Sequence, residues 1–287
     1  MSGAGNDFVV VDNRSGAVRD PSTLARKLCT RRLSVGADGL ILIESSARAT
    51  FRMRYFNADG SLADFCANGT RCAARFALLN VIASRRMTIE TGAAVVPAEV
   101  VDQRVTLSIS PPSGFEAIRP LAIRSGREIR GSFLRVGVPH YVIFVREGLW
   151  ERDIDALGRE IRHHPDLQPD GANVNFVTIR GRNDLDIRTW ERGVEAETLA
   201  CGSGVVASVS VSAISGRVES PVRVRTRSGV ILTVTFSGGS SADGPRIGAL
   251  TLSGDARVVY RGVLLPEATE GFDPEWVAHP TENVLES

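Results

Sequence analysis

The stretch Cys66-Ala67-Asn68-Gly69-Thr70, which runs on into CAARFALLNVI at residues 72–82, decides how this chain is interpreted. A second stretch, Cys201-Gly202-Ser203-Gly204, runs on in the same way into VVASVSVSAI. In both, a cysteine precedes a turn of small residues and an apolar helical pattern. A helix start offers unpaired backbone N–H groups and a positive dipole end, which favour a thiolate and bind a carboxylate. Two such places indicate a pair of bases that work on opposite faces of one substrate.

The two cysteines lie in a repeat. Gly36-Ala37-Asp38 precedes the first and Gly171-Ala172-Asn173 the second, with 30 positions from glycine to cysteine in both halves. Each half also has an amphipathic helical pattern, at residues 21–32 and 154–164, and runs rich in Val, Ile and Thr that alternate as strands do. The pattern predicts an α/β (α+β) fold of two pseudo-symmetric domains. Each is a mostly antiparallel sheet wrapped around the central helix that follows the cysteine, with the active site in the cleft between the domains.

The domain boundaries follow from turn-forming residues. The stretch SPPSGFEAIRP at residues 110–120 reads as the connection between the halves. We therefore expect an N-terminal half at 1–113, a C-terminal half at 114–259 and a tail at 260–287 that packs back on the first domain.

Composition excludes several classes of protein. The net charge of +1 gives no reason to expect nucleic acid or a membrane as partner, and neither a membrane-spanning run nor a signal peptide is evident, so we expect a cytoplasmic protein. The four cysteines and four histidines show no metal-ligand spacing, so no metal is expected. Cys29 and Cys72 read as small buried hydrophobes. Lys27 is the one lysine among 34 basic residues and has no phosphate-binding loop beside it, which argues against pyridoxal phosphate and leaves no cofactor expected.

Paired cysteines suit the inversion of a carbon centre. A thiolate on one face removes a proton and a thiol on the other returns one, which fits the α-carbon of an amino acid whose carboxylate is held at the helix starts. Two alternatives remain: both cysteines are structural turn residues, or one is the nucleophile of a hydrolase with His140 as its base. The hydrolase does not explain the second cysteine.

Several motifs carry a resemblance to a known family. They are GAGNDF with Asn6, Asn57-Ala58-Asp59-Gly60, FCANGTRC, Pro139-His140, and Glu191-Arg192-Gly193 leading to ETLACGSG. From residue 3 to about residue 262 the chain resembles diaminopimelate epimerases, and the two cysteine motifs are the most specific part of the match.

The resemblance implies a cofactor-independent enzyme that interconverts LL- and meso-diaminopimelate for lysine and peptidoglycan synthesis, with a small-molecule amino-acid substrate and a homodimeric assembly. It makes Cys66 and Cys201 the two bases. His140 and Glu191 would then set thiol protonation and hold the substrate amine. Backbone N–H groups of Ala67, Asn68, Gly202 and Ser203 would bind the reacting carboxylate. Asn6, Asn57, Asn173 and Arg192 match positions that bind substrate, including its distal end.

Some of these residues also have simpler interpretations. Asn57 reads as a turn former, Asn6 as a cap, and Arg192 beside Glu191 as a surface ion pair. Asp7 and Asp38 would orient loops, and His163-His164 end a helix.

The chain departs from the family pattern at four places. Val138 replaces the asparagine before Pro-His, which removes a hydrogen-bonding group expected at the distal end of diaminopimelate. Ala67 replaces a glycine, which a negative φ would tolerate. One extra residue follows Glu191, and we expect the loop to absorb it. The chain also begins almost at GAGNDF, where relatives have a preceding strand, so we expect that strand to be lost or the start to be misassigned. Val138 keeps a racemase of another amino acid as an alternative, and a non-catalytic binding protein on this fold is a second one.

Overall fold

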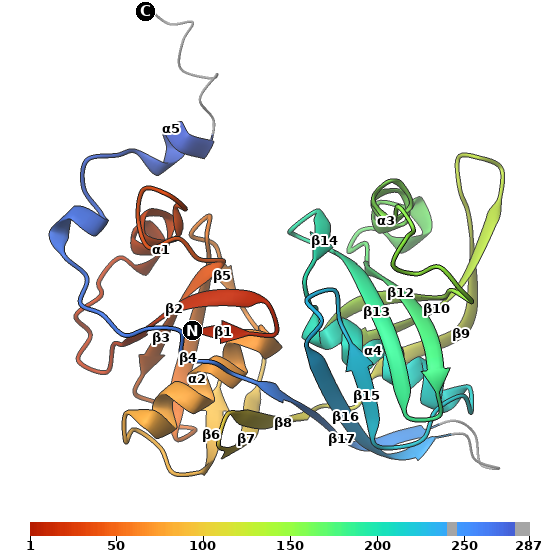
Figure 1. The fold of residues 1–287 in the computed structure, drawn as a ribbon, viewed down its shortest axis with the longest axis horizontal. Helices are drawn as coiled ribbons and strands as arrows, with labels where there is room; N and C mark the ends of the chain where they lie inside the picture. Colours follow the sequence, from red (N-terminus) through yellow and green to blue (C-terminus); the bar gives the residue numbers. More distant parts are fainter. Residues whose placement is uncertain (240–245, 279–287) are drawn as a thin grey trace, which may run out of the picture. The chain divides into compact units, whose positions relative to one another are not determined.

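The computed structural model describes residues 1–239 and 246–278, which form two compact units. Unit 1 is Met1–Gln103 together with the chain from Ala256 onward, and unit 2 is Arg104–Asp255. Each unit is a sheet with helices, so the expected mixed α/β fold with a duplicated domain is confirmed (Figure 1).

Unit 1 contains a mixed sheet in the order β1-β2-β3-β4-β6-β7, and the short strand β5 also pairs with β4. Its strands are β1 (Ser2–Gly3), β2 (Asn6–Asp12), β3 (Gly39–Glu44), β4 (Phe51–Asn57), β5 (Leu62–Ala63), β6 (Arg86–Glu90) and β7 (Val95–Val101). Its main helices are α1 (Pro21–Cys29) and α2 (Ala67–Leu79). β2 and β3 are parallel and joined by α1, whereas β3 and β4 form an antiparallel pair.

The two helices of unit 1 use opposite faces of β3, because successive side chains of a strand point to opposite sides. Leu40 and Leu42 join the apolar cluster that α1 supplies with Ala25 and Leu28. α1 begins where the Asp20 carboxylate accepts a hydrogen bond from Thr23 N, with Pro21 in the first turn. α2 packs on the sheet along its first half and becomes exposed toward Leu79.

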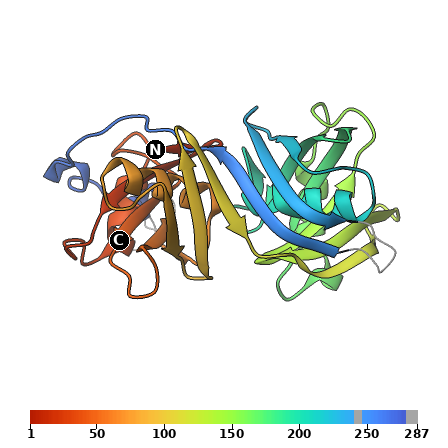
Figure 2. The same cartoon turned by 90° about the horizontal axis from the view of Figure 1, so that it is seen from below.

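The C-terminal segment returns to unit 1, where it runs in dark blue along the outside of the unit (Figures 1 and 2). Ser2 and Arg257 form an isolated bridge. Ser34 Oγ then donates to the carbonyl of Ala268 at 2.6 Å, within the 3-10 turn η2 (Pro266–Ala268). The segment ends in the short helix α5 (Pro274–Ala278), and residues 279–287 of the expected tail lie outside the described residues.

Unit 2 contains a sheet in the order β9-β10-β11-β12-β13-β15-β16-β17-β8, and the short strand β14 also pairs with β13. Its strands are β8 (Arg104–Ile109), β9 (Ser113–Ala122), β10 (Glu128–Val136), β11 (Val138–Phe144), β12 (Asn173–Gly181), β13 (Asp184–Glu191), β14 (Ala196–Thr198), β15 (Val222–Arg225), β16 (Ile231–Gly239) and β17 (Arg246–Asp255). Its helices are α3 (Asp155–Arg162), the turn η1 (Pro165–Leu167) and α4 (Gly202–Ile214).

Helix α4 is the central helix that the apolar run predicts. It contacts β10, β11, β12, β13, β16 and β17, which surround it (Figure 1). Nearly all of its residues are buried, including the serines Ser208, Ser210 and Ser212. α3 covers another side of the sheet, where Ile161 joins a core that contains Phe176 and Trp190.

Both units follow the same path, which supports the duplication. A parallel pair joined by a helix (β2-α1-β3 and β11-α3-β12) leads into an antiparallel hairpin, then a two- or three-residue strand, then the helix that a cysteine precedes. The strand after that helix pairs in parallel with the hairpin strand in each unit, as β6 with β4 and β15 with β13.

The units divide at Gln103 and Asp255, whereas the sequence interpretation puts the divisions at residues 113 and 259. The difference arises because β8 pairs with β17, so this strand belongs to unit 2. Residues 113–120, expected in the connection, are part of β9, which pairs with β10 and with no other strand of the described ranges. An edge strand tolerates Pro120. Within the described ranges no helix is long and apolar enough to cross a membrane.

Candidate active site

Cys66 is the N-cap of α2. Its backbone is extended, with φ −142° and ψ 108°, and its Sγ accepts a hydrogen bond from Gly69 N at 3.4 Å. The carbonyl of Cys66 accepts from both the N–H and the hydroxyl of Thr70. The sulfur therefore occupies the place that a serine or aspartate oxygen takes in an ordinary helix cap.

Cys201 has the same role in unit 2. It is the N-cap of α4, with φ −108° and ψ 109°, and its Sγ accepts from Gly204 N at 3.4 Å. The hydroxyl of Ser203 lies 3.5 Å from the same sulfur. The two cysteines thus share one local geometry, in topologically equivalent places of the two units.

The two helix starts present a matching set of backbone amides. In each helix the third N–H binds the cysteine sulfur, and the first two N–H groups belong to Ala67 and Asn68 in α2 and to Gly202 and Ser203 in α4. The N–H groups in the first turn of a helix point out of its N-terminal end, which is the direction from which an anion binds. Ala67 is the first residue of α2 and is not among the residues with positive φ, so the alanine in place of glycine is accommodated.

Around Cys66 a chain of side chains fixes the orientation of two asparagines. Asn68 Nδ2 donates to Asn6 Oδ1 at 2.6 Å, and Asn6 Nδ2 donates to Asp38 Oδ2 at 2.9 Å. At the other end the fully buried Arg71 donates to Asn68 Oδ1 at 2.8 Å. Arginine only donates and a carboxylate only accepts, so the two charged ends determine which way each amide points.

Asp38 is in turn held by unit 1. Arg31 donates to Asp38 Oδ1 at 2.9 Å and to both carboxylate oxygens of Asp7. Burial alone would raise the pKa of Asp7, but the hydrogen bonds and charge of Arg31 hold that pKa below its ordinary value. The expectation that Asp7 and Asp38 orient loops thus gains a geometric basis, and Arg71 and Arg31 are partners that the motif analysis missed.

Asn57 lies at the same end of the sheet. Strand pairing aligns Phe8 with Gly39 and Gly39 with Asn57, so Asn57 is close to the start of β3. Its side chain, however, donates to Ser61 Oγ at 2.9 Å within the turn that follows β4. This contact matches its interpretation as a turn former.

In unit 2 the buried imidazole of His140 is neutral. Burial, together with the positive charge of Arg192, lowers its pKa to about 3. Its Nδ1 lies 3.2 Å from Asn175 Nδ2, which places the imidazole proton on Nε2. Among the described residues Nε2 has no hydrogen-bond partner.

Asn175 is a site residue that the sequence interpretation missed. It is fully buried, and its Oδ1 accepts a hydrogen bond from Thr189 Oγ1 at 3.0 Å, which leaves Nδ2 facing His140. Its side chain also packs against Gly204 in the first turn of α4. The sequence could have indicated Asn175 by its position, two residues after Asn173 in the same strand. This spacing puts both side chains on one face of the sheet.

Asn173, Glu191 and Arg192 meet at one end of the unit 2 sheet. His140 pairs with Asn173, and the next pair, Val174 with Trp190, brings Glu191 alongside. Asn173 Oδ1 accepts from Arg192 N at 2.8 Å, and Glu191 Oε2 accepts from Thr198 Oγ1 at 2.8 Å. Arg192 Nη1 donates to the carbonyl of Asp170 at 3.2 Å. These polar groups lie in the same unit as Cys201.

The remaining cysteines have the burial that was expected. Cys29 and Cys72 are buried, and none of the four cysteines forms a disulfide. Burial, with Asp7 and Asp38 nearby, raises the pKa of Cys29 to about 12. Cys29 is therefore protonated at neutral pH.

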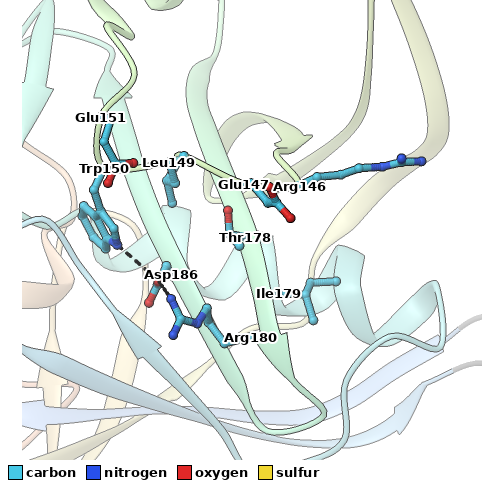
Figure 3. Close-up of a pocket in the computed structure, with 10 residues that line it drawn as sticks. Arg146, Glu147, Leu149, Trp150, Glu151, Thr178, Ile179, Arg180 and Asp186 are labelled. Carbon is cyan, nitrogen blue, oxygen red and sulfur yellow. Dashed lines mark hydrogen bonds and ion pairs between the residues drawn. The ribbon is translucent and has the colours of Figure 1, made fainter.

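A cavity of about 370 Å³ lies elsewhere in unit 2 (Figure 3). It is lined by the loop after β11, which contains Trp150, and by Thr178, Arg180 and Asp186 of β12 and β13. Asp186 accepts from the indole of Trp150 at 3.2 Å and from Arg180 at 3.4 Å. None of the predicted site residues lines it.

Comparison with known proteins identifies the family of the chain. Residues 1–113 and 132–243 match the family model of diaminopimelate epimerase. The chain is 40% identical over 283 residues to the diaminopimelate epimerase of Aquifex aeolicus, covering 94% of this chain and 98% of that protein. The chain belongs to the diaminopimelate epimerase family.

Two further similarities concern the sequence and the fold. The diaminopimelate epimerase of Chlorobaculum tepidum is 43% identical over 271 residues, covering 92% of this chain and 99% of that protein. A PhzF-family phenazine biosynthesis protein of Bacillus anthracis superposes with a TM-score of 0.65 at 15% identity, over 89% of this chain and 92% of that one. That likeness concerns the fold alone.

Proposed function

We propose that this protein is a diaminopimelate epimerase that interconverts LL- and meso-2,6-diaminopimelate without a cofactor. The observation that carries the proposal is the equivalence of Cys66 and Cys201, each the cap of a helix at the same step of a repeated fold. Family membership supports the choice of substrate.

The proposed reaction is a proton exchange that balances on the two sulfurs. One cysteine is a thiolate and takes the α-proton, and the electron pair of the broken C–H bond passes toward the α-carboxylate. The thiol of the other cysteine then delivers its proton to the opposite face of the carbon. The centre is inverted, and the thiolate has moved from one cysteine to the other, so the enzyme is ready for the reverse reaction.

Backbone amides supply the stabilisation that the carbanionic intermediate needs. The N–H groups of Ala67 and Asn68, and those of Gly202 and Ser203, stand at positive helix ends and are proposed to bind the reacting carboxylate as charge builds on it. The same dipoles favour the thiolate form of each cysteine.

Side chains around the two helix starts are proposed to hold the rest of the substrate. His140 is neutral and carries its proton on Nε2, so it acts as a hydrogen-bond donor rather than a cation. Glu191 supplies the negative charge for a substrate amine, and Arg192 the positive charge for a carboxylate. Asn6, Asn57 and Asn173 complete the proposed set.

The cellular context is part of the proposal. Diaminopimelate serves lysine and peptidoglycan synthesis, and we place the enzyme in the cytoplasm as a homodimer with no nucleic acid or membrane partner. The near-neutral net charge of +1 supports the absence of a polyanionic partner.

The experiment is α-proton exchange in deuterated water. The reduced protein is incubated with LL-diaminopimelate and with other amino acids, and loss of the α-proton signal is followed by NMR. Exchange and formation of the meso isomer with diaminopimelate alone is the expected result. Exchange with another amino acid alone would contradict the proposed substrate.

One observation favours a second candidate, a racemase of another amino acid. Val138, the first residue of β11, stands where an asparagine is expected to bind the distal end of diaminopimelate. The same amino-acid panel tests this candidate. Absence of exchange with every amino acid would favour the non-catalytic binding protein.

A further inference from the structure

The loop between β13 and β14 holds a glutamate in an uncommon backbone conformation. Glu191 of β13 pairs with Ala196 of β14, so residues 192–195 form the loop between the two strands. This loop accommodates the extra residue that follows Glu191. Glu195 closes this loop by donating its N–H to the carbonyl of Glu191 at 2.9 Å, with φ +57°. Residues other than glycine rarely adopt this left-handed backbone conformation. They remain in it where surrounding contacts hold them.

The surrounding contacts come from its own carboxylate. Oε1 of Glu195 accepts from Gly193 N and from Arg162 Nε, each at 3.0 Å, and Oε2 lies 3.0 Å from His163 Nε2. Arg162 is the last residue of α3 and His163 follows it directly. Burial alone would raise the pKa of Glu195, but the Gly193 amide and the Arg162 and His163 side chains hold it below its ordinary value. The carboxylate is therefore charged at neutral pH and ties the loop to the end of α3.

The same contacts continue to the predicted substrate residues. A side chain at Gly171 would overlap the guanidinium of Arg162, so Arg162 packs directly on the turn that leads to Asn173. Asn173 then accepts from Arg192 N at 2.8 Å, which returns to the loop. A closed ring of contacts joins the end of α3, the turn before β12 and the loop that follows Glu191.

We propose that Glu195 is a positioning residue, whose carboxylate fastens this loop to the end of α3 and so holds Glu191 and Arg192 in place for the amine and the distal carboxylate of the substrate. This inference rests on the proposed function. Glycine would adopt φ +57° without strain, but it would lose all three side-chain contacts. The contacts of the carboxylate hold Glu195 in this conformation.

The test compares Glu195→Gly, Glu195→Gln and Val81→Gly with the unaltered protein. Val81 is a matched control, because it is 91% exposed and also has φ +57°. Glu195→Gly is expected to raise the KM for diaminopimelate about tenfold with kcat within about twofold, as loss of substrate positioning predicts. Glu195→Gln keeps an acceptor for Gly193 and Arg162, so its KM is expected to stay close to that of the unaltered protein. Val81→Gly is expected to leave KM unchanged.

Amide hydrogen exchange of the substrate-free protein supplies a second readout. The amides of Arg192 and Gly193 donate to Asn173 and Glu195, and they are expected to exchange about tenfold faster in Glu195→Gly than in Val81→Gly. Unchanged KM in Glu195→Gly would overturn the positioning role, whether or not exchange changes. If the unaltered protein exchanges no α-proton, the proposed function fails. Unchanged amide exchange in Glu195→Gly would then show by itself that the Glu195 carboxylate does not fasten the loop to the end of α3.

Discussion

A cysteine sulfur in the cap position links acid–base chemistry to the start of a helix. Oxygen acceptors of serine or aspartate usually take this position, and a neutral thiol is a weaker acceptor. A thiolate accepts more strongly and also meets the positive helix end. In Cys66 and Cys201 the deprotonated state that takes the α-proton in the proposed reaction is therefore also the state that caps the helix better.

Serine variants separate the two roles of each cysteine. Cys66→Ser and Cys201→Ser keep an acceptor in the cap, so the free energy of unfolding is expected to stay within about 1 kcal/mol of the unaltered protein. Neither hydroxyl ionises at neutral pH, so kcat for epimerisation is expected to fall at least about 10³-fold in each variant. Cys29→Ala is the control, because Cys29 is buried at the end of α1 and keeps its proton. Full turnover in either serine variant would remove that cysteine from the mechanism.

The depressed pKa of His140 predicts a direction for acid sensitivity. Its pKa is about 3 in the folded protein, against an ordinary value of 6.5. Between these values the unfolded chain binds more protons, so this group lowers the free energy of unfolding as pH falls from about 6.5 toward 3. Above about 6.5 its contribution is level. Urea unfolding across this range is expected to show a smaller loss of stability in His140→Gln than in the unaltered protein, and equal losses would contradict the neutral buried state.

At the scale of elements, the first turns of the two cysteine helices have different room for a side chain. A Cβ on Gly69 would lie 3.1 Å from Ile41 Cδ1 and 3.2 Å from Met53 Cε, which are flexible ends. A Cβ on Gly204 would overlap the amide oxygen of Asn175. That oxygen accepts a hydrogen bond from Thr189, and the nitrogen of the same amide faces His140.

We therefore expect Gly204→Ala to be much more damaging than Gly69→Ala. Gly204→Ala is expected to lower kcat/KM about 10²-fold, since it displaces a side chain near the reacting groups. Gly69→Ala is expected to cost about 1–3 kcal/mol of unfolding free energy, as overpacking does, with a smaller change in kcat/KM. Kinetics and urea unfolding of both variants provide the check, and the reverse order of kcat/KM would contradict this account.

Sequence patterns predicted the long elements well and the irregular ones poorly. The apolar run after Cys201 predicted α4, and the amphipathic patterns predicted α1 and α3. β9 was missed because Pro120 and Gly114 resemble a linker, while an edge strand accepts them. Asn175 was missed because its contact with His140 depends on the register of β11 with β12. Local sequence does not specify that register.

At the scale of the whole molecule, the two units differ in continuity. Unit 2 is one uninterrupted stretch, whereas unit 1 needs the chain from Ala256 onward. That segment supplies the Ser2–Arg257 bridge, a hydrogen bond from Arg75 to the Ala256 carbonyl, and the contact of Ala268 with the α1 core. The repeat predicted two units, but the boundaries depend on the pairing of β8 with β17, which are far apart in sequence.

This difference predicts how fragments behave. A fragment of residues 104–255 keeps every strand pairing of its sheet and is expected to unfold cooperatively in urea, as followed by circular dichroism. A fragment of residues 1–103 lacks the returning segment and is expected to unfold at lower urea concentration with a broader transition. A fragment of residues 1–103 as stable as unit 1 in the full chain would show that the segment contributes nothing.

The returning segment also sets an order of events on the ribosome. Domains commonly fold as they emerge, with the N-terminal one first. Here the first hundred residues leave the ribosome without Arg257, which bridges Ser2, and without Ala268, which is translated more than 160 positions after them. The unit that carries Cys201 is consequently the first that synthesis can complete, and the one that carries Cys66 stays unfinished until almost the whole chain has been made.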